Sequence, residues 1–150
     1  MWRYVKDLFD KNGVANARWI FAVNWEDVPC DNHFLQYYPG NEYTDYVAID
    51  GYNWGTQLPW GKWMEFKDIF YARYNEIVKN IPKPVIISEF GSASVGGNRA
   101  RWIKKAFREV SSMDKVSAVI LFNVDKEADW RLKEGAADAR ALRDSLRRYC

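Results

Sequence analysis

A glutamate ends a run of apolar, mostly β-branched residues in the segment PVIISEFGS, Pro84 to Ser92. The apolar run predicts a buried strand over about 84–89, which places Glu89 at its carboxyl end. A carboxylate there has no obvious structural use, whereas an ionised carboxylate can act as a nucleophile toward an electrophilic carbon. Glu89 is therefore the first candidate for a catalytic residue.

Three other apolar runs end in polar residues in the same way. Strands are expected over about 17–23, 45–51 and 116–122, and the tips that follow read Asn24-Trp25-Glu26, Asp50-Gly51-Tyr52-Asn53 and Asn123-Val124-Asp125. Ligands of parallel α/β folds bind outside the carboxyl ends of the strands, so we expect these tips to form one site. Turn capping explains each tip taken alone, but it explains Glu and Tyr at the tips less well than Asp, Asn and Ser.

Helical periodicity between these strands completes a βα repeat. Helices are expected over about 2–12, 63–80, 98–112 and 136–148, whereas 24–44 has no clear helical pattern. The strands are nearly continuous apolar runs, which is typical of parallel strands covered on both faces. The sequence therefore predicts an α/β fold with four parallel strands and flanking helices, as one domain spanning 1–150.

Composition narrows the classes of partner. The 150 residues have a net charge of +2, which argues against nucleic acid or an anionic membrane as the main partner. No apolar run approaches the roughly 20 residues that cross a bilayer, and the charged, amphipathic first residues do not resemble a signal peptide. The chain has two cysteines (Cys30 and Cys150) and one histidine (His33), which form no metal-spaced cluster. We expect no metal or cofactor, and the sequence leaves the cellular location open.

Aromatic residues make up 17% of the chain, with eight tryptophans and nine tyrosines. A tryptophan-rich core would explain this content. Several rings, however, adjoin loop residues, where flat rings suit the apolar faces of sugars as well as partner interfaces. The candidate substrate contacts are Trp25, Trp54 and Trp130, together with Asn53 and Asn123 at strand ends.

The strand-end segments, taken together, resemble the C-terminal half of glycoside hydrolase family 26. This family comprises retaining β-mannanases and β-glucanases built on a (β/α)8 barrel. The resemblance covers essentially the whole chain. The matching segments are GVANARWIFAVNW around strand five, YYPGNEYTDYVAIDGYNWG around strand six, KPVIISEFGS with GGNRARWI around strand seven, and SAVILFNVDKEADWRL around strand eight.

The resemblance implies roles for individual residues. Glu89 matches the catalytic nucleophile, and Tyr52 matches the tyrosine that hydrogen-bonds it; Trp25, Trp54 and Trp130 fall where the family lines its sugar cleft. A retaining enzyme also needs an acid/base carboxyl roughly 5–5.5 Å from the nucleophile. The family places that glutamate after strand four in a His-Glu-Met-Asn-like motif, which this sequence does not contain. On strand eight the family usually presents a tryptophan as a sugar platform, near the position that Leu121 occupies in this sequence.

The match implies half of a barrel, with four βα units and two open strand edges. Exposed strand edges of this kind tend to pair with further strands. A homodimer with two-fold symmetry could in this way rebuild a barrel of eight strands. The strand three positions before that of Glu89 would then be the partner's fourth strand, which ends in FNVDKEADW. Asp125, Glu127 and Asp129 become candidate general acids in trans, although the sequence is at least as compatible with three solvated loop carboxylates. Glu127 is preferred, because its side chain is longer and shielding by Trp130 would raise its pKa.

Three functions are compatible with the sequence. The favoured one is a retaining β-glycosidase, active as an assembled oligomer on β-linked glucosides, mannosides or related oligosaccharides. The second is a non-catalytic carbohydrate-binding remnant of a glycosidase barrel. The third is an inert fragment whose aromatic residues only form a core. The sequence does not distinguish the sugar, nor endo from exo cleavage.

Overall fold

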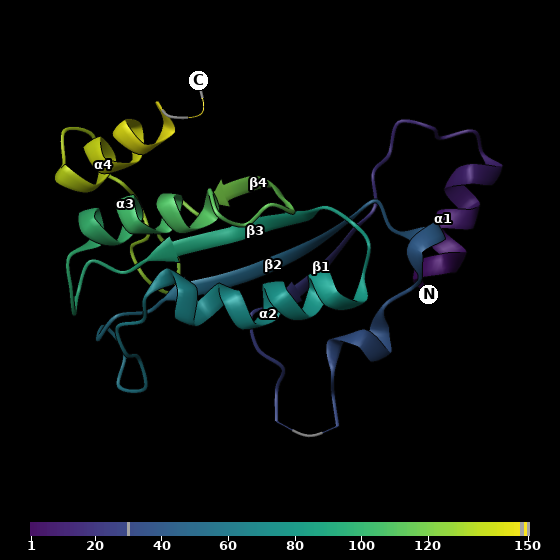
Figure 1. Ribbon diagram of the computed structural model, residues 1–150, viewed down its shortest axis with the longest axis horizontal. Helices are drawn as coiled ribbons and strands as arrows, with labels where there is room; N and C mark the ends of the chain where they lie inside the picture. Colours follow the sequence, from purple (N-terminus) through teal and green to yellow (C-terminus); the bar gives the residue numbers. More distant parts are fainter. Residues whose placement is uncertain (30, 148, 150) are drawn as a thin grey trace.

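The computed structural model describes residues 1–29, 31–147 and 149; the two cysteines fall outside it. Four parallel strands form one sheet in the order β1 (Ile20–Asn24), β2 (Tyr46–Asn53), β3 (Val85–Ser92) and β4 (Val116–Leu121). The helices are α1 (Trp2–Lys11), α2 (Phe66–Asn80), α3 (Arg99–Val110) and α4 (Ala137–Leu146), with 3-10 turns at Phe34–Tyr37 and Asn41–Tyr43. The predicted four parallel strands with flanking helices are confirmed, and Figure 1 shows them.

The hydrophobic core lies between the sheet and helices α2 and α3. Val47 and Ile49 of β2 and Val85 and Ile87 of β3 are fully buried in it. The Asn98 side chain caps α3 by accepting a hydrogen bond from the Arg101 backbone N–H, as the sequence predicts. Among the described residues, no helix combines the length and the apolar character needed to cross a bilayer.

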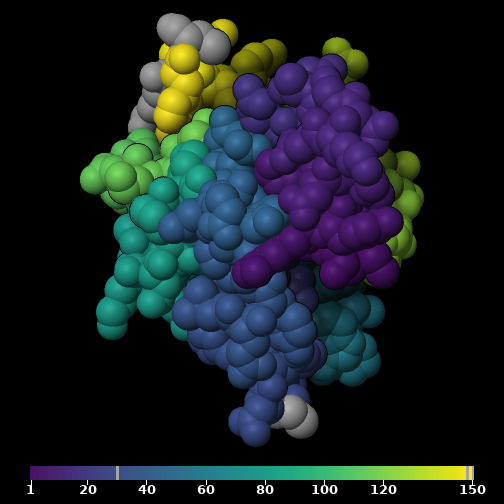
Figure 2. All heavy atoms as spheres, turned by 90° about the vertical axis from the view of Figure 1, so that its right-hand side faces the viewer, coloured from purple at the N-terminus to yellow at the C-terminus, as the bar shows by residue number. Residues whose placement is uncertain are grey.

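Helix α1 lies beside the amino end of β1, opposite the predicted site. The Trp2 ring packs edge-on against Trp19 and Phe21, and its Nε1 donates to the Tyr43 carbonyl at 2.9 Å. Figure 2 views this end, where α1 (purple) lies beside the segment that leads into β2 (blue). The carboxyl ends of the strands therefore lie at the other end of the molecule, away from α1 (Figure 1).

The second and third strands extend beyond the predicted ends. Strand β3 continues to Ser92, because parallel pairing with β2 continues through Tyr52↔Gly91 and Asn53↔Ser92. Glu89 therefore lies inside β3 and not at its tip, which corrects the prediction. Helix α2 begins at Phe66 rather than 63, since the Met64 backbone N–H donates to the Asn53 side chain at 2.9 Å.

A β-bulge at Ser88 sets the direction of the Glu89 side chain. The register passes from Ile49↔Ile87 to Asp50↔Glu89, so Ser88 has no opposite residue. Val85, Ile87 and then Phe90 face the helices, whereas Glu89 is turned to the opposite, inner face. Without the extra residue, strict alternation would direct Glu89 into the helix layer.

Side chains on the inner face of the sheet are buried on the middle strands and exposed on the outer ones. Ala48 and Ile86 are buried, but Ile20 of β1 is 41% exposed and Ile120 of β4 is 55% exposed. Within the described residues, β1 and β4 each have one strand neighbour. Both edges of the sheet thus leave apolar side chains and backbone groups without cover.

Gly51 allows β2 to approach α2 closely, and this contact can be tested. A Cβ at Gly51 would lie 2.6 Å from Ile69 Cγ2 and 3.0 Å from Phe70 Cζ. We expect Gly51→Ala to lower the free energy of unfolding by about 1–3 kcal/mol through overpacking, as measured by urea denaturation. In a double-mutant cycle, Ile69→Ala should relieve part of this cost; additive losses would show that the two sites do not clash.

Candidate active site

Glu89 and Tyr52 meet on the inner face, near the carboxyl ends of β3 and β2. The Tyr52 hydroxyl donates a hydrogen bond to Glu89 Oε2, and both side chains are half-buried. Burial raises the pKa of Tyr52 well above its ordinary value, as do the hydrogen bond and the negative charges of Glu89, Asp50 and Glu127. The phenol therefore keeps its proton and fixes the orientation of the Glu89 carboxyl group.

Asp50 is a third polar residue at this point, and the sequence analysis did not single it out as catalytic. It lies directly opposite Glu89 in the β2–β3 register. With its amide nitrogen toward the carboxylate, Asn24 donates to Asp50 Oδ1 at 2.7 Å. Burial raises the pKa of Asp50, and the charge of Glu89 raises it further. Asp50 lies two residues before Tyr52, so both side chains are on the same face of β2. This spacing is the sequence signal that points to Asp50.

Aromatic rings surround Tyr52. Its ring centroid lies 4.8 Å from that of Trp130, 5.5 Å from Phe122 and 5.9 Å from Trp54. A Cβ at Gly91 would come within 3.2 Å of the Trp130 ring, so a glycine permits this close approach. Trp130 is only 2% exposed. The prediction of Trp130 as an open sugar platform is therefore wrong for this arrangement, because the ring packs beneath Tyr52.

Trp25 and Trp54 are the predicted tryptophans that reach the surface of the site. With Glu26, Asp50 and Tyr52 they line a cavity of about 470 Å³ outside the ends of β1 and β2. Trp54 also stacks edge-on with Trp60, which is 66% exposed. The Trp54 ring thus lies beside Tyr52, whereas Trp25 lines the same cavity and also packs against the main hydrophobic core.

The two predicted asparagines occupy different positions. Asn53 is fully buried: its Nδ2 donates to Ser92 Oγ at 2.9 Å, and its Oδ1 accepts from the backbone N–H groups of Gly55 and Met64. Asn53 therefore anchors the loop after β2. Because the side chain is buried, the prediction that Asn53 contacts substrate is corrected. Asn123 is exposed, and its Oδ1 accepts a hydrogen bond from the Leu132 backbone N–H at 2.7 Å.

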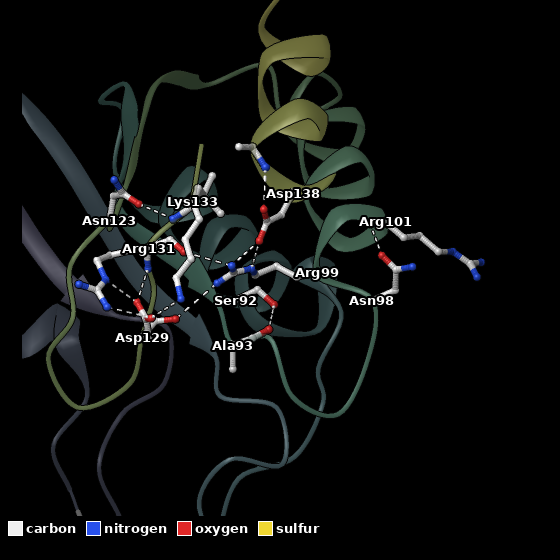
Figure 3. Close-up of polar contacts among 12 residues, drawn as sticks. Ser92, Ala93, Asn98, Arg99, Arg101, Asn123, Asp129, Arg131, Lys133 and Asp138 are labelled. Carbon is white, nitrogen blue, oxygen red and sulfur yellow. Dashed lines mark hydrogen bonds and ion pairs between the residues drawn. The ribbon is translucent and has the colours of Figure 1, made fainter. Parts of the chain in front are cut away.

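The predicted environment of the general-acid candidates is also wrong. Glu127 is exposed rather than shielded by Trp130; its own backbone amide and Lys126, 3.0 Å away, lower its pKa. Asp125 pairs with Arg131 at 2.7 Å. The Arg131 guanidinium also holds the pKa of Asp129 far below its usual value, and Figure 3 shows this pair. Within this single chain, the pKa values of Glu127 and Asp129 are thus shifted in the opposite direction from that expected of a general acid.

The side chains within the described ranges form no group of three or more His, Cys, Asp or Glu residues able to hold a metal ion. The chemistry available at the site is therefore that of two neighbouring carboxyl groups, Asp50 and Glu89, with a phenol donor and flanking tryptophan rings. Such a set suits nucleophilic attack by one carboxylate on a sugar carbon.

Comparison with known proteins relates the chain to glycoside hydrolases. No protein-family model matches it. It is 42% identical over 146 residues to Endoglucanase H of Acetivibrio thermocellus, an alignment that covers 96% of this chain and 16% of the relative. The chain thus spans about one sixth of that relative's length.

Solved structures share the fold at low sequence identity. An endo-β-1,4-mannanase from Thermotoga petrophila superposes with a TM-score of 0.52 at 16% identity, over 71% of this chain and 26% of that one. An engineered protein superposes with a TM-score of 0.62 at 19% identity, over 96% of this chain and 33% of that one. The four strands and their helices therefore match half of a (β/α)8-type barrel.

The raised pKa of Asp50 predicts a pH-dependent gain in stability for Asp50→Asn. Protonated Asp50 contributes to the stability of the fold, and this contribution is fully present at pH values below the unfolded-state pKa of about 3.9. It is lost as the pH rises through the higher pKa of the folded state. We expect Asp50→Asn to have a higher free energy of unfolding than wild type at pH 7, with the difference shrinking toward pH 4. Urea denaturation at both pH values measures it.

The exposed Asp114 provides the matched control. Asp114→Asn should change the free energy of unfolding little at either pH. A loss of stability in Asp50→Asn at pH 7 would mean that the charged carboxylate is favourable where it lies, contrary to the expected cost of its burial beside Glu89.

Proposed function

We propose that the chain forms part of a retaining β-glycosidase of the family 26 type, with Glu89 as nucleophile and Tyr52 as its hydrogen-bond partner. The observation that supports this most directly is the hydrogen bond from Tyr52 to Glu89 at adjoining strand ends, beside a cavity lined by Trp25 and Trp54. The segment shared with an endoglucanase and the fold shared with mannanases support β-linked glucosides or mannosides as substrates.

In the proposed reaction, the Glu89 carboxylate attacks the anomeric carbon and displaces the leaving-group oxygen, which takes a proton from a general acid. The resulting glycosyl ester on Glu89 is then attacked by water, which gives up a proton to the same group, and free Glu89 is restored. Tyr52 holds the attacking oxygens in one orientation throughout. The rings of Trp25 and Trp54 would pack on the apolar faces of the sugar.

The general acid is the part of the site that a single chain does not supply in a suitable environment. We propose that a second copy closes the barrel, since the β1 and β4 edges are both uncovered. Counting strands around such a barrel brings the partner's β4 loop, with its copies of Asp125 and Glu127, across from Glu89. Burial on assembly would have to raise the Glu127 pKa from its lowered value in the single chain.

A carbohydrate-binding remnant without catalysis is the second candidate. The observation that favours it is the open tryptophan pair, Trp54 with the largely exposed Trp60, which can take a sugar ring without any general acid. Binding of β-linked oligosaccharides, followed by tryptophan fluorescence in a sample that does not cleave them, would establish this function instead.

Replacing the nucleophile tests the catalytic proposal. We expect Glu89→Gln to lower aryl β-glycoside turnover by at least about a thousandfold with an unchanged circular dichroism spectrum, since the amide cannot form the glycosyl ester. Tyr52→Phe should lower kcat by about 10- to 1000-fold with a smaller change in KM, because the lost donor acts on the nucleophile. Wild-type turnover in Glu89→Gln would remove Glu89 from the mechanism.

Complementation between two inactive chains tests the shared site. Mixing Glu89→Ala with Glu127→Ala should restore part of the hydrolysis after subunit exchange, because a mixed dimer has one site with both carboxyl groups intact. Mixing each variant with itself is the control, and native mass spectrometry follows the exchange. Proven exchange without recovery, or full activity in the Glu127→Ala, Asp125→Ala and Asp129→Ala chains, would rule out the acid in trans.

A further inference from the structure

The loop between β4 and α4 supplies the ring on which Tyr52 rests. This loop has little regular structure of its own: an isolated bridge joins Asp125 to Asp129, and the Trp130 backbone N–H donates to the Val124 carbonyl at 3.1 Å. Trp130 is nevertheless among the most deeply buried side chains of the described protein. The backbone around it therefore needs a further constraint to keep the ring in place.

Arg99 supplies that constraint from the first turn of α3. Its guanidinium donates to the carbonyls on both sides of Trp130, at 3.4 Å for Asp129 and 3.1 Å for Arg131. Its Nε donates to Asp138 Oδ2 at 2.6 Å, and the side chains of Arg99 and Asp138 are each 11% exposed. Figure 3 shows Arg99 between the loop and the start of α4, with dashed contacts to both.

Helix stability does not explain an arginine at this position. Cations are disfavoured at helix amino termini by the helix dipole, and the first turn of α3 contains no acidic residue. Asp138, in contrast, lies in the first turn of α4, where a carboxylate is favoured, and its Oδ1 accepts from the Ala139 N–H at 2.8 Å. Asp138 thus compensates the Arg99 charge and orients its planar donor group toward the loop.

We propose that Arg99 and Asp138 are positioning residues: they hold the backbone on both sides of Trp130, keep its ring against Tyr52, and so fix the Tyr52 hydroxyl on Glu89. The placement of Tyr52 is a structural statement, whereas its effect on turnover rests on the proposed glycosidase function. A bidentate guanidinium is needed because two carbonyls and one carboxylate are bound at once, which a lysine ammonium cannot do in the same plane.

Arg99→Met, with Arg101→Met as control, separates this role from a general effect on α3. Arg101 lies in the same turn, is exposed, and points away from the loop in Figure 3. Hydrogen exchange of the 123–132 backbone should accelerate by about tenfold or more in Arg99→Met, while 102–110 stays protected. The aromatic NMR signal of Tyr52, assigned by its loss in Tyr52→Phe, should move toward its position in Trp130→Ala. Arg101→Met should leave both unchanged.

Kinetics add the functional part of the test. In an active assembly, Arg99→Met should lower kcat by about 10- to 100-fold with a smaller change in KM, and Arg99→Lys should restore only part of it. Unchanged exchange, or faster exchange with an unmoved Tyr52 signal, would overturn the positioning role. A wild-type protein that cleaves no glycoside would contradict the proposed function alone, since exchange and the Tyr52 signal still decide whether Arg99 positions the ring.

Discussion

The candidate site depends on the bulge at Ser88 in β3. The extra residue moves Glu89 from the helix-facing side of the strand to the inner side, where the Tyr52 hydroxyl meets it. It also returns Phe90 to the core, where its ring stacks on Trp102 at 5.9 Å. The Ser88 hydroxyl donates to the Ile49 carbonyl at the same point of the ladder. One local irregularity thus satisfies two demands that strict alternation could not meet together: a buried phenylalanine on one face and a reachable carboxylate on the other.

Two glycines allow the neighbouring elements to use this geometry. Gly51 lets β2 lie close against Ile69 of α2, and Gly91 lets Trp130 reach the ring of Tyr52. The phenol is then enclosed by aromatic side chains and cannot readily turn away from Glu89. A hydrogen bond that would be weak and mobile in water is held in a partly desolvated setting, where it is stronger and better oriented.

The sequence predicts the βα repeat and the polar strand ends, because apolar runs and the polar residues that follow them are local signals. The strand order and the hydrogen bond between Tyr52 and Glu89 are expected from the family resemblance. The sequence does not predict the bulge, since VIISEF reads equally well as a regular strand. The burial of Asn53 and Trp130 depends on loops that return from distant elements. The pKa of Glu127 is lowered by its own backbone amide and by Lys126, an arrangement of the loop that the sequence does not reveal.

The uneven cover of the two faces of the sheet links the fold to its chemistry. The helix-facing side is closed by α2 and α3, whereas on the inner side Trp130 and the loop after β4 close the part around Tyr52. Asp50 and Glu89 sit at the boundary between this filled part and the open part. Partial burial raises the pKa of Asp50, and the charge of Glu89 adds to this effect. A surface that covers the open part of the inner face beside the pair would remove more water from it and strengthen the repulsion between the two carboxylates. The closure of the barrel that we propose would therefore also tune its carboxyl groups, which links the open inner face to the general acid that we expect from a second copy.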